Sequence, residues 1–150
     1  MNCLSFKTKF GWIGAFEKKN KIVMVKFGKY HNKSVSKNLK KLRSNIFNFF
    51  NKKNQKINSK IHISGNLIQK KIWRQLTKIQ YGSTKSYGQI AKKFKLSPRH
   101  VGKICGQNKI ALIVPCHRVI RSDGTMGGFS AIGGTSLKKK LLHFENSWKH

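Results

Sequence analysis

The stretch “SYGQIAKKFKLSPRHVGKIC”, residues 86–105, contains the signals of two short helices joined by a turn of about four residues. Ser86 and Gln89 have capping-box spacing, which predicts that the first helix begins here. Ser97 can cap a second helix that has Pro98 in its first turn. The inner faces of these helices would contain Tyr87, Ile90, Ala91 and Phe94, and then Val101, Ile104 and Cys105.

This helix pair is typical of a helix-turn-helix, in which the second helix faces nucleic acid. The outer face of the second helix carries Arg99, His100 and Lys103. Gly102 would let a partner approach closely, because it has no side chain. The same pattern fits two helices of an ordinary α domain with solvated cations outside, so the pattern alone leaves both interpretations open.

Further elements are expected on both sides of this stretch. Before it, a stripe at helical spacing consists of Ile68, Ile72, Leu76 and Ile79, with Trp73 alongside. After it, “IALIV” (110–114) predicts a buried strand, residues 121–135 a glycine-rich loop and residues 136–145 a closing helix. Glu145 continues the inward stripe of this helix, where a carboxylate is costly unless something donates to it.

The first third of the chain has a different character. Residues 3–28 predict β structure, with “KKNK” (18–21) as a turn. Residues 34–50 change to a helical period, and the polar residues 51–60 precede a short strand at “KIHIS” (60–64). We therefore predict an N-terminal α/β domain at residues 1–63 and a mainly helical C-terminal domain at residues 64–150. The predicted helical stripe of the first domain is Val35, Leu39, Leu42, Ile46 and Phe49.

Charge is the strongest bias in the composition. Thirty-three Lys plus Arg oppose three acids, Glu17, Asp123 and Glu145, for a formal net charge of +30. Such a surface attracts polyanions, so nucleic acid is the first candidate partner. A coding bias toward A and T would also produce abundant Lys, Asn and Ile. Arginine is scarce, so each arginine is expected where a planar fork is needed. The five are Arg43, Arg74, Arg99, Arg118 and Arg121.

The cysteines and the N-terminus indicate a reducing compartment. Cys3, Cys105 and Cys116 are too few for a disulfide framework, and none forms the CxxC pair of a zinc site. Residues 1–10 lack the apolar core of a signal peptide, and no run approaches a membrane span. We expect a cytoplasmic protein without membrane attachment, metal or cofactor.

The sequence “PCHR”, residues 115–118, places Cys116 and His117 side by side where the predicted strand ends. A free cysteine is often buried and inert, which is the first interpretation. The second is a nucleophile, because His117 and Arg118 are donors or cations whose company favours a thiolate. Glu145 would then orient His117, and His117 would take the proton from Cys116, directly or through a water.

Two kinds of chemistry fit a Cys-His-acid set. Thiol proteases and other acyl-transfer enzymes need an oxyanion hole and release their product. A cysteine that attacks an alkyl carbon needs a thiolate, a pocket for the leaving group and a donor to protonate what leaves. The adjacent helix-turn-helix fits the second kind better.

At these residues the chain resembles the O6-alkylguanine-DNA alkyltransferases, also called methylated-DNA–protein-cysteine methyltransferases. The resemblance rests on “PCHRVI” followed by “SDGTMGGFS”, preceded by “SYGQIA” and “RHVGKICGQN”, and it covers about residues 66–145. It implies a ribonuclease-H-like α/β N-terminal domain. It also implies a mainly α C-terminal DNA-binding and alkyl-acceptor domain, with a winged-helix-like helix-turn-helix that enters the minor groove.

The resemblance also implies roles for individual residues. Cys116 would accept the alkyl group, and His117 would be the base, acting through a water. Glu145 would hold His117, and Asn108 would support the turn of the motif. Tyr87 would crowd the target phosphate and donate a proton to the departing guanine. The DNA contacts would be Arg99 as the finger that enters the stack, with Ser86, Tyr87, Gly102, Lys103 and Arg118; Val119, Phe129 and Ser130 would line the guanine pocket.

The implied function is direct DNA repair on double-stranded DNA that contains O6-alkylguanine, with O4-methylthymine as a further substrate. The target oxygen lies inside the duplex, so the base must leave the stack. The product is a thioether, so each molecule, expected to be a monomer, would act once. A binding module without transfer is the main alternative, and a thiol hydrolase with repeated turnover is a third hypothesis.

Some residues depart from the pattern of the family. His100 follows the finger arginine, where a small alanine is usual, and Lys109 and Ala111 replace prolines. Phe129 stands where tyrosine is usual, and the loop at 130–135 is about two residues longer than the usual turn. These changes bear on alkyl-group preference and rate more than on the reaction.

Overall fold

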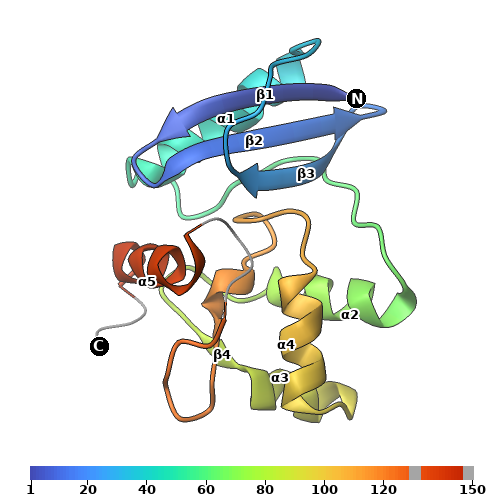
Figure 1. Cartoon of the computed structure of the whole chain (residues 1–150), viewed down its shortest axis with the longest axis vertical. Helices are drawn as coiled ribbons and strands as arrows, with labels where there is room; N and C mark the ends of the chain where they lie inside the picture. Colours follow the sequence, from blue (N-terminus) through green and yellow to red (C-terminus); the bar gives the residue numbers. More distant parts are fainter. Residues whose placement is uncertain (129–132, 147–150) are drawn as a thin grey trace. The chain divides into compact units, whose positions relative to one another are not determined.

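Three antiparallel strands begin the chain, in agreement with the β structure predicted for residues 3–28. They are β1 (Asn2–Thr8), β2 (Gly11–Lys18) and β3 (Lys21–Phe27), in the sheet order β1-β2-β3 (Figure 1). The computed structural model describes residues 1–128 and 133–146. Lys19 and Asn20 connect β2 to β3 with φ angles of 52° and 64°. Two positive φ angles in a two-residue loop match the right-handed twist of the strands that it joins.

Helix α1 (Lys37–Phe50) lies along one face of this sheet (Figure 1). Ser36 begins the helix, because its side chain accepts a hydrogen bond from the Leu39 N–H at 3.2 Å. The predicted stripe is confirmed for four of its five positions, whereas Val35 precedes the helix. The buried face that packs on β1 and β2 contains Leu39, Leu42, Ile46, Phe49 and Phe50.

A glycine in the middle of β2 allows an aromatic ring to lie against the sheet. Gly14 is buried, and a Cβ placed on it would overlap Cδ2 of the Tyr30 ring. That ring also packs edge-on against Phe16, with 5.2 Å between ring centroids. The position therefore requires the absence of a side chain.

We expect Gly14→Ala to lower the free energy of unfolding by about 1 to 3 kcal/mol, because the added methyl group overpacks this site. Urea unfolding followed by circular dichroism measures the change. In a Tyr30→Ala background the same substitution should cost much less. An equal loss in both backgrounds would show that the ring is not the cause.

The chain divides into two compact units, of which the first contains residues 1–64 and 109–113 and the second contains residues 65–108 and 114–150. The sequence predicts a domain boundary after residue 63, with residues 109–113 in the C-terminal domain. They belong to the first because Val25 of β3 exchanges backbone hydrogen bonds with Lys109 and Ala111, at 2.9 and 3.0 Å.

Among the described residues, two segments that were predicted to be strands form only isolated β-bridges. “IALIV” forms one bridge, between Ile110 and Val25, and then turns, with Leu112 at φ 70°. “KIHIS” likewise forms a single bridge, between Ile61 and Ile22. The apolar residues Ile110 and Leu112 are buried as predicted, but burial does not require a strand.

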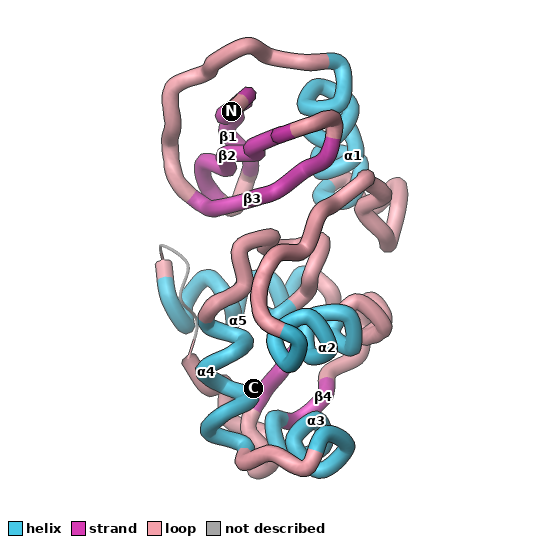
Figure 2. Tube along the Cα trace, turned by 90° about the vertical axis from the view of Figure 1, so that its right-hand side faces the viewer, coloured by secondary structure: helices cyan, strands magenta, loops and turns pink. Residues whose placement is uncertain are grey.

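The second unit is mainly helical (Figure 2). Its elements are α2 (Leu67–Leu76), β4 (Lys85–Ser86), α3 (Tyr87–Phe94), α4 (Pro98–Gly106), the 3₁₀ turn η1 (Cys116–Arg118), β5 (Val119–Ile120) and α5 (Gly134–Phe144). Strands β4 and β5 are parallel, with Ser86 opposite Ile120. This pairing brings the start of α3 beside the segment that follows the Pro-Cys-His-Arg motif.

The predicted helix starts are confirmed. Ser86 and Gln89 form a reciprocal capping box at α3, and Ser97 caps α4 with Pro98 in its first turn. Helix α2 begins at a second capping box, formed by Asn66 and Gln69, which sequence reasoning missed although the spacing is the same.

Helices α3 and α4 pack against each other and are joined by residues 95–97. Lys95 has a left-handed conformation with φ 57°, which reverses the chain within this short turn. Trp73 of α2 donates an indole hydrogen bond to the Ile104 carbonyl at 3.0 Å and so ties α2 to α4. The predicted pair of short helices joined by a turn is therefore present.

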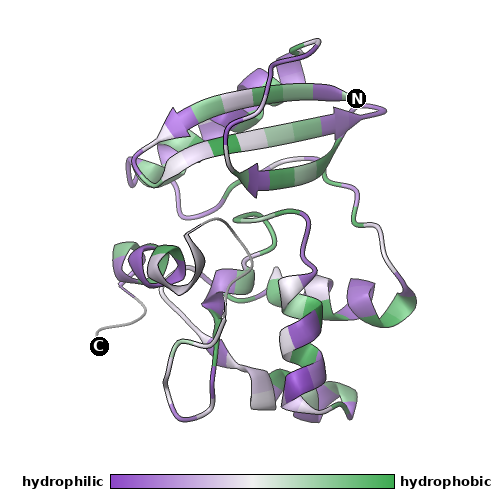
Figure 3. Ribbon diagram, in the orientation of Figure 1, coloured by the Kyte–Doolittle hydropathy of each residue, from purple (hydrophilic) through white to green (hydrophobic). Residues whose placement is uncertain are grey.

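Hydropathy alternates along the strands and around the helices, which Figure 3 shows as adjacent green and purple bands. The buried apolar core of the second unit includes Ile72, Leu76, Ile90, Val101, Ile104, Leu141 and Leu142. None of the helices in residues 1–128 and 133–146 combines the length and the apolar character that a membrane crossing needs.

Candidate active site

The Pro-Cys-His-Arg motif forms a buried turn of 3₁₀ helix rather than the end of a strand. Cys116, His117 and Arg118 are all buried. Asn108 holds this turn from the segment after α4: its side-chain amide donates to the Val114 carbonyl at 2.8 Å and to Cys116 Sγ at 3.2 Å. The amide therefore contacts both the backbone that precedes the thiol and the sulfur itself.

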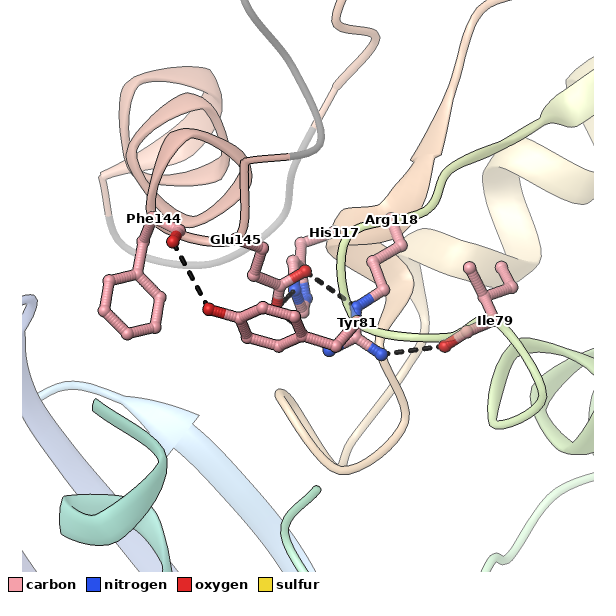
Figure 4. Close-up of polar contacts among 6 residues, drawn as sticks. All are labelled: Ile79, Tyr81, His117, Arg118, Phe144 and Glu145. Atoms are coloured by element: carbon pink, nitrogen blue, oxygen red, sulfur yellow. Dashed lines mark hydrogen bonds and ion pairs between the residues drawn. The ribbon is translucent and has the colours of Figure 1, made fainter. Parts of the chain in front are cut away.

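Glu145 lies at the centre of a buried network at the end of α5 (Figure 4). Its Oε2 accepts from Nε2 of His117 at 3.0 Å. Its two oxygens also accept from Nε and Nη2 of Arg118, at 2.8 and 2.9 Å. Glu145 and His117 are each 1% exposed. The inward position predicted for Glu145 is thus confirmed, with three donors compensating its burial.

The ionisation of this network follows from its contacts. Burial would raise the pKa of Glu145, but hydrogen bonds and charge from His117 and Arg118 outweigh it and lower the pKa to about 2. Burial lowers the pKa of His117, although Glu145 opposes that shift. An ionised carboxylate only accepts, so Nε2 of a neutral His117 carries the proton and Nδ1 keeps a lone pair.

Arg118 has a different position from the one expected of a DNA contact. It is 7% exposed, and its guanidinium bonds to Glu145 and, through Nη1 at 2.8 Å, to the Ile79 carbonyl. Because these contacts hold the whole fork inside the unit, Arg118 is not available to phosphates. The planar guanidinium of Arg118 therefore binds groups of the protein itself, Glu145 and the Ile79 carbonyl (Figure 4).

The sulfur of Cys116 also differs from the expectation that its neighbours favour a thiolate. Burial raises the pKa of Cys116, and the opposing effects of the Asn108 amide and the Lys138 charge do not cancel it. The resting Cys116 is therefore a protonated thiol, and a reaction at its sulfur needs a general base that removes the proton.

A cavity of about 650 Å³ opens against this thiol. It brings together several residues that the sequence singled out, among them Tyr87, Arg99, Gly102 and Cys116. None of its lining residues in the described chain is acidic. The remaining lining residues are Pro98, Cys105, Gly106, Arg121, Ser122, Gly127 and Gly128.

Other predicted site residues lie outside this lining. Val119 is fully buried in β5, so its predicted place in the pocket wall is not borne out by its position. Ser86 is the cap of α3, and Lys103 is exposed on α4. Phe129 and Ser130 lie outside the described residues.

Lys138 is a site residue that sequence reasoning missed. It is fully buried in α5, and its Nζ donates to Tyr87 Oη and to the Gly128 carbonyl, each at 3.1 Å. Burial lowers the pKa of Lys138 to about 8 and raises that of Tyr87 to about 12. The signal was present, because Lys138 stands seven residues before Glu145 and so shares its face of the helix.

Gly127 completes the contact around Tyr87. It has a φ of 72°, and a Cβ at this position would lie 2.9 Å from Tyr87 Oη. Only glycine combines this backbone conformation with such a close approach. The glycine-rich segment predicted as a loop therefore lies directly against the tyrosine.

The helix pair and the basic cavity, with the buried thiol of Cys116 in its lining, are typical of a DNA-binding protein that carries a cysteine at its site. Residues 67–147 match the family model described as “6-O-methylguanine DNA methyltransferase, DNA binding domain”. A methylated-DNA–protein-cysteine methyltransferase of Metallosphaera sedula is 32% identical over 146 residues, which are 95% of this chain and 92% of that protein. The chain therefore belongs to the 6-O-methylguanine DNA methyltransferase family.

Two further comparisons agree with this assignment. The methylated-DNA–protein-cysteine methyltransferase of Sulfolobus acidocaldarius is 39% identical over 98 residues, which are 65% of this chain. The match spans 61% of that relative, and 41% and 42% of two others, so these are matched over part of their length. A crystal structure of Mycobacterium tuberculosis OGT in complex with DNA has a TM-score of 0.85 and 26% identity, covering 95% of this chain and 91% of that one.

Proposed function

We propose that this protein repairs DNA by moving the alkyl group of O6-methylguanine onto Cys116. The observation that carries the proposal is the cavity in which Cys116 lies together with Tyr87 and Arg99. A thiol at the wall of a basic cavity beside a helix pair suits an extruded base. The presence of that thiol at the cavity argues against a binding module without transfer.

The transfer begins with the removal of a proton from the buried thiol. His117 accepts this proton through a water, because its Nδ1 has a lone pair while Nε2 donates to Glu145. Glu145 stabilises the resulting imidazolium, since its pKa of about 2 keeps it ionised. Asn108 donates to the thiolate as the negative charge forms on Cys116 Sγ.

The second part of the reaction exchanges one bond at the alkyl carbon. The Sγ–C bond forms as the C–O6 bond breaks, and the electron pair of the broken bond stays on guanine. Tyr87 then donates its proton to the guanine. Its pKa of about 12 keeps the Tyr87 hydroxyl protonated at rest. Because Tyr87 Oη accepts a hydrogen bond from Lys138, its own proton is left to be donated to guanine.

The expected partner is double-stranded DNA, which α4 meets at the minor groove through Arg99, Gly102 and Lys103. The short α3–α4 turn supports a winged-helix-like helix-turn-helix, and the three-stranded sheet with α1 supports a ribonuclease-H-like first unit. That the Mycobacterium tuberculosis relative was crystallised in complex with DNA supports this partner. The protein acts as a monomer, and O4-methylthymine is a further substrate.

One experiment tests the proposal directly. A duplex with one methyl-labelled O6-methylguanine, mixed with the protein, should transfer one label per chain to the peptide that contains Cys116, as read by mass spectrometry. No second turnover should follow, because a thioether does not revert to a thiol.

The controls separate transfer from binding and from hydrolysis. Cys116→Ala should accept no label, whereas Cys3→Ala, which changes a cysteine of the first unit, should accept one. Lesion binding without loss of the free thiol would favour the binding module. Repeated release of product from one protein molecule would favour a hydrolase.

A further inference from the structure

Arg121 is an arginine beside the cavity that the proposed mechanism leaves without a role. Its backbone is fixed on both sides: its N–H donates to the Thr125 carbonyl and its carbonyl accepts from Gly124, both at 3.0 Å. Its side chain is exposed. The turn thus holds the backbone of Arg121 in place while its side chain is exposed to solvent.

Asp123, the acid nearest to Arg121 in the sequence, lies within reach of the charge of Arg121 but forms its hydrogen bonds with Thr125. Oδ1 of Asp123 accepts from the backbone N–H and the hydroxyl of Thr125, at 2.9 and 2.7 Å. Within residues 1–128 and 133–146, no carboxylate forms an ion pair with the Arg121 guanidinium. The fork of Arg121 is therefore available to an anion from outside.

The sheet pairing places Arg121 beside a residue of the reacting site. Ser86 is opposite Ile120, so Tyr87 and Arg121 are the next residues on the two paired segments. Burial raises the pKa of Tyr87, and the charge of Arg121 opposes that rise. Arg121 is therefore close enough to Tyr87 for its charge to act on the Tyr87 hydroxyl.

The cavity carries an arginine on each of two walls. Arg99 lines it from α4 and Arg121 from the end of β5. A nucleotide that leaves the stack brings its own phosphate toward the opening of the cavity. A guanidinium fork binds phosphate through two parallel hydrogen bonds, and a chain that otherwise uses Lys has Arg here.

We propose that Arg121 binds a phosphate of the DNA strand that carries the extruded base, and so positions that strand for transfer to Cys116. This inference rests on the proposed function and adds a positioning residue to it. Arg99, which lines the cavity from α4, remains free to fill the space that the base leaves.

The test compares Arg121→Ala and Arg121→Lys with Arg74→Ala, a control that removes an exposed arginine of α2 outside the cavity lining. The Kd for a lesion duplex is measured at several salt concentrations, and the maximal transfer rate at saturating DNA. Arg121→Ala should raise Kd about tenfold. It should also lower the slope of log Kd against log salt by about 0.9, the value for one lost phosphate contact.

Arg121→Lys should keep the slope, because the charge remains, and recover part of the affinity, because the fork is lost. Arg74→Ala should match the parent protein. If Arg121→Ala keeps the parent Kd and slope, or lowers the maximal rate with Kd unchanged, Arg121 does not bind a phosphate of the DNA. The Kd values are measured on Cys116→Ala versions of each protein, because a protein that keeps the thiol would consume the lesion as it binds. If the parent protein binds lesion DNA but no methyl group reaches Cys116, the proposed function is overturned and the phosphate contact is not.

Discussion

Replacing Glu145 with alanine should lower the free energy of unfolding of the second unit by about 3 to 5 kcal/mol. The carboxylate is 1% exposed and accepts three hydrogen bonds, two of them from Arg118. Its removal leaves a buried guanidinium with one remaining acceptor, the Ile79 carbonyl. Urea unfolding of both proteins, followed by circular dichroism, measures this loss.

The same substitution should change how stability depends on pH. The pKa of Glu145 is lowered from 4.5 to about 2 in the folded protein. A lowered folded pKa contributes stability that is present above the unfolded value and is lost as pH falls from about 4.5 to about 2. The variant should therefore lose less stability across this acid range than the parent protein does.

Asp123→Ala is the matched control, since Asp123 is the acid of the second unit that lies exposed. It should leave the unfolding curve close to that of the parent at neutral pH. If Glu145→Ala unfolds at the same urea concentration as Asp123→Ala, the network does not hold the motif in place.

Replacing His117 with glutamine should slow methyl transfer about 100- to 10,000-fold, the usual contribution of a general base. The reason is that burial raises the pKa of Cys116, so its proton must be taken by a neighbouring group. Burial also lowers the pKa of His117, which keeps the imidazole neutral and ready to accept that proton. Single-turnover rates with lesion DNA measure the effect.

The pH profile distinguishes a lost base from a damaged fold. In the parent, transfer should slow as pH falls, because protonation of His117 removes the base. In His117→Gln, the rate should rise with pH and the defect should shrink as the thiol ionises without help. His143→Gln, an exposed change on α5, should behave like the parent. Parent-like rates for His117→Gln at every pH would remove His117 from the mechanism.

Much of the local structure could be predicted because its causes lie within a few residues. The capping boxes and the Ser97 cap depend on side chains three positions from their backbone partners. The inward position of Glu145 follows from helical periodicity alone. The second capping box, at Asn66, and the buried Lys138 carried the same kinds of signal and could have been found.

The strand expected at “IALIV” failed for a reason that periodicity cannot detect. A short apolar run predicts burial but not backbone conformation. Here Val25, more than 80 residues earlier, pairs with Lys109 and Ala111, and the chain then turns at Leu112. The same long-range pairing moved residues 109–113 into the first unit.

The sequence by itself determined the helix pair, the Pro-Cys-His-Arg motif, the candidate base His117 and the inward position of Glu145, because spacing along the chain defines each of them. Only the tertiary structure decided that Arg118 bonds to Glu145 and to the Ile79 carbonyl, that Lys138 lies against Tyr87, and that the thiol is buried at rest. These outcomes depend on which distant groups share a buried volume. Desolvation and long-range hydrogen bonds set the charge states there, and neither is encoded in neighbouring residues.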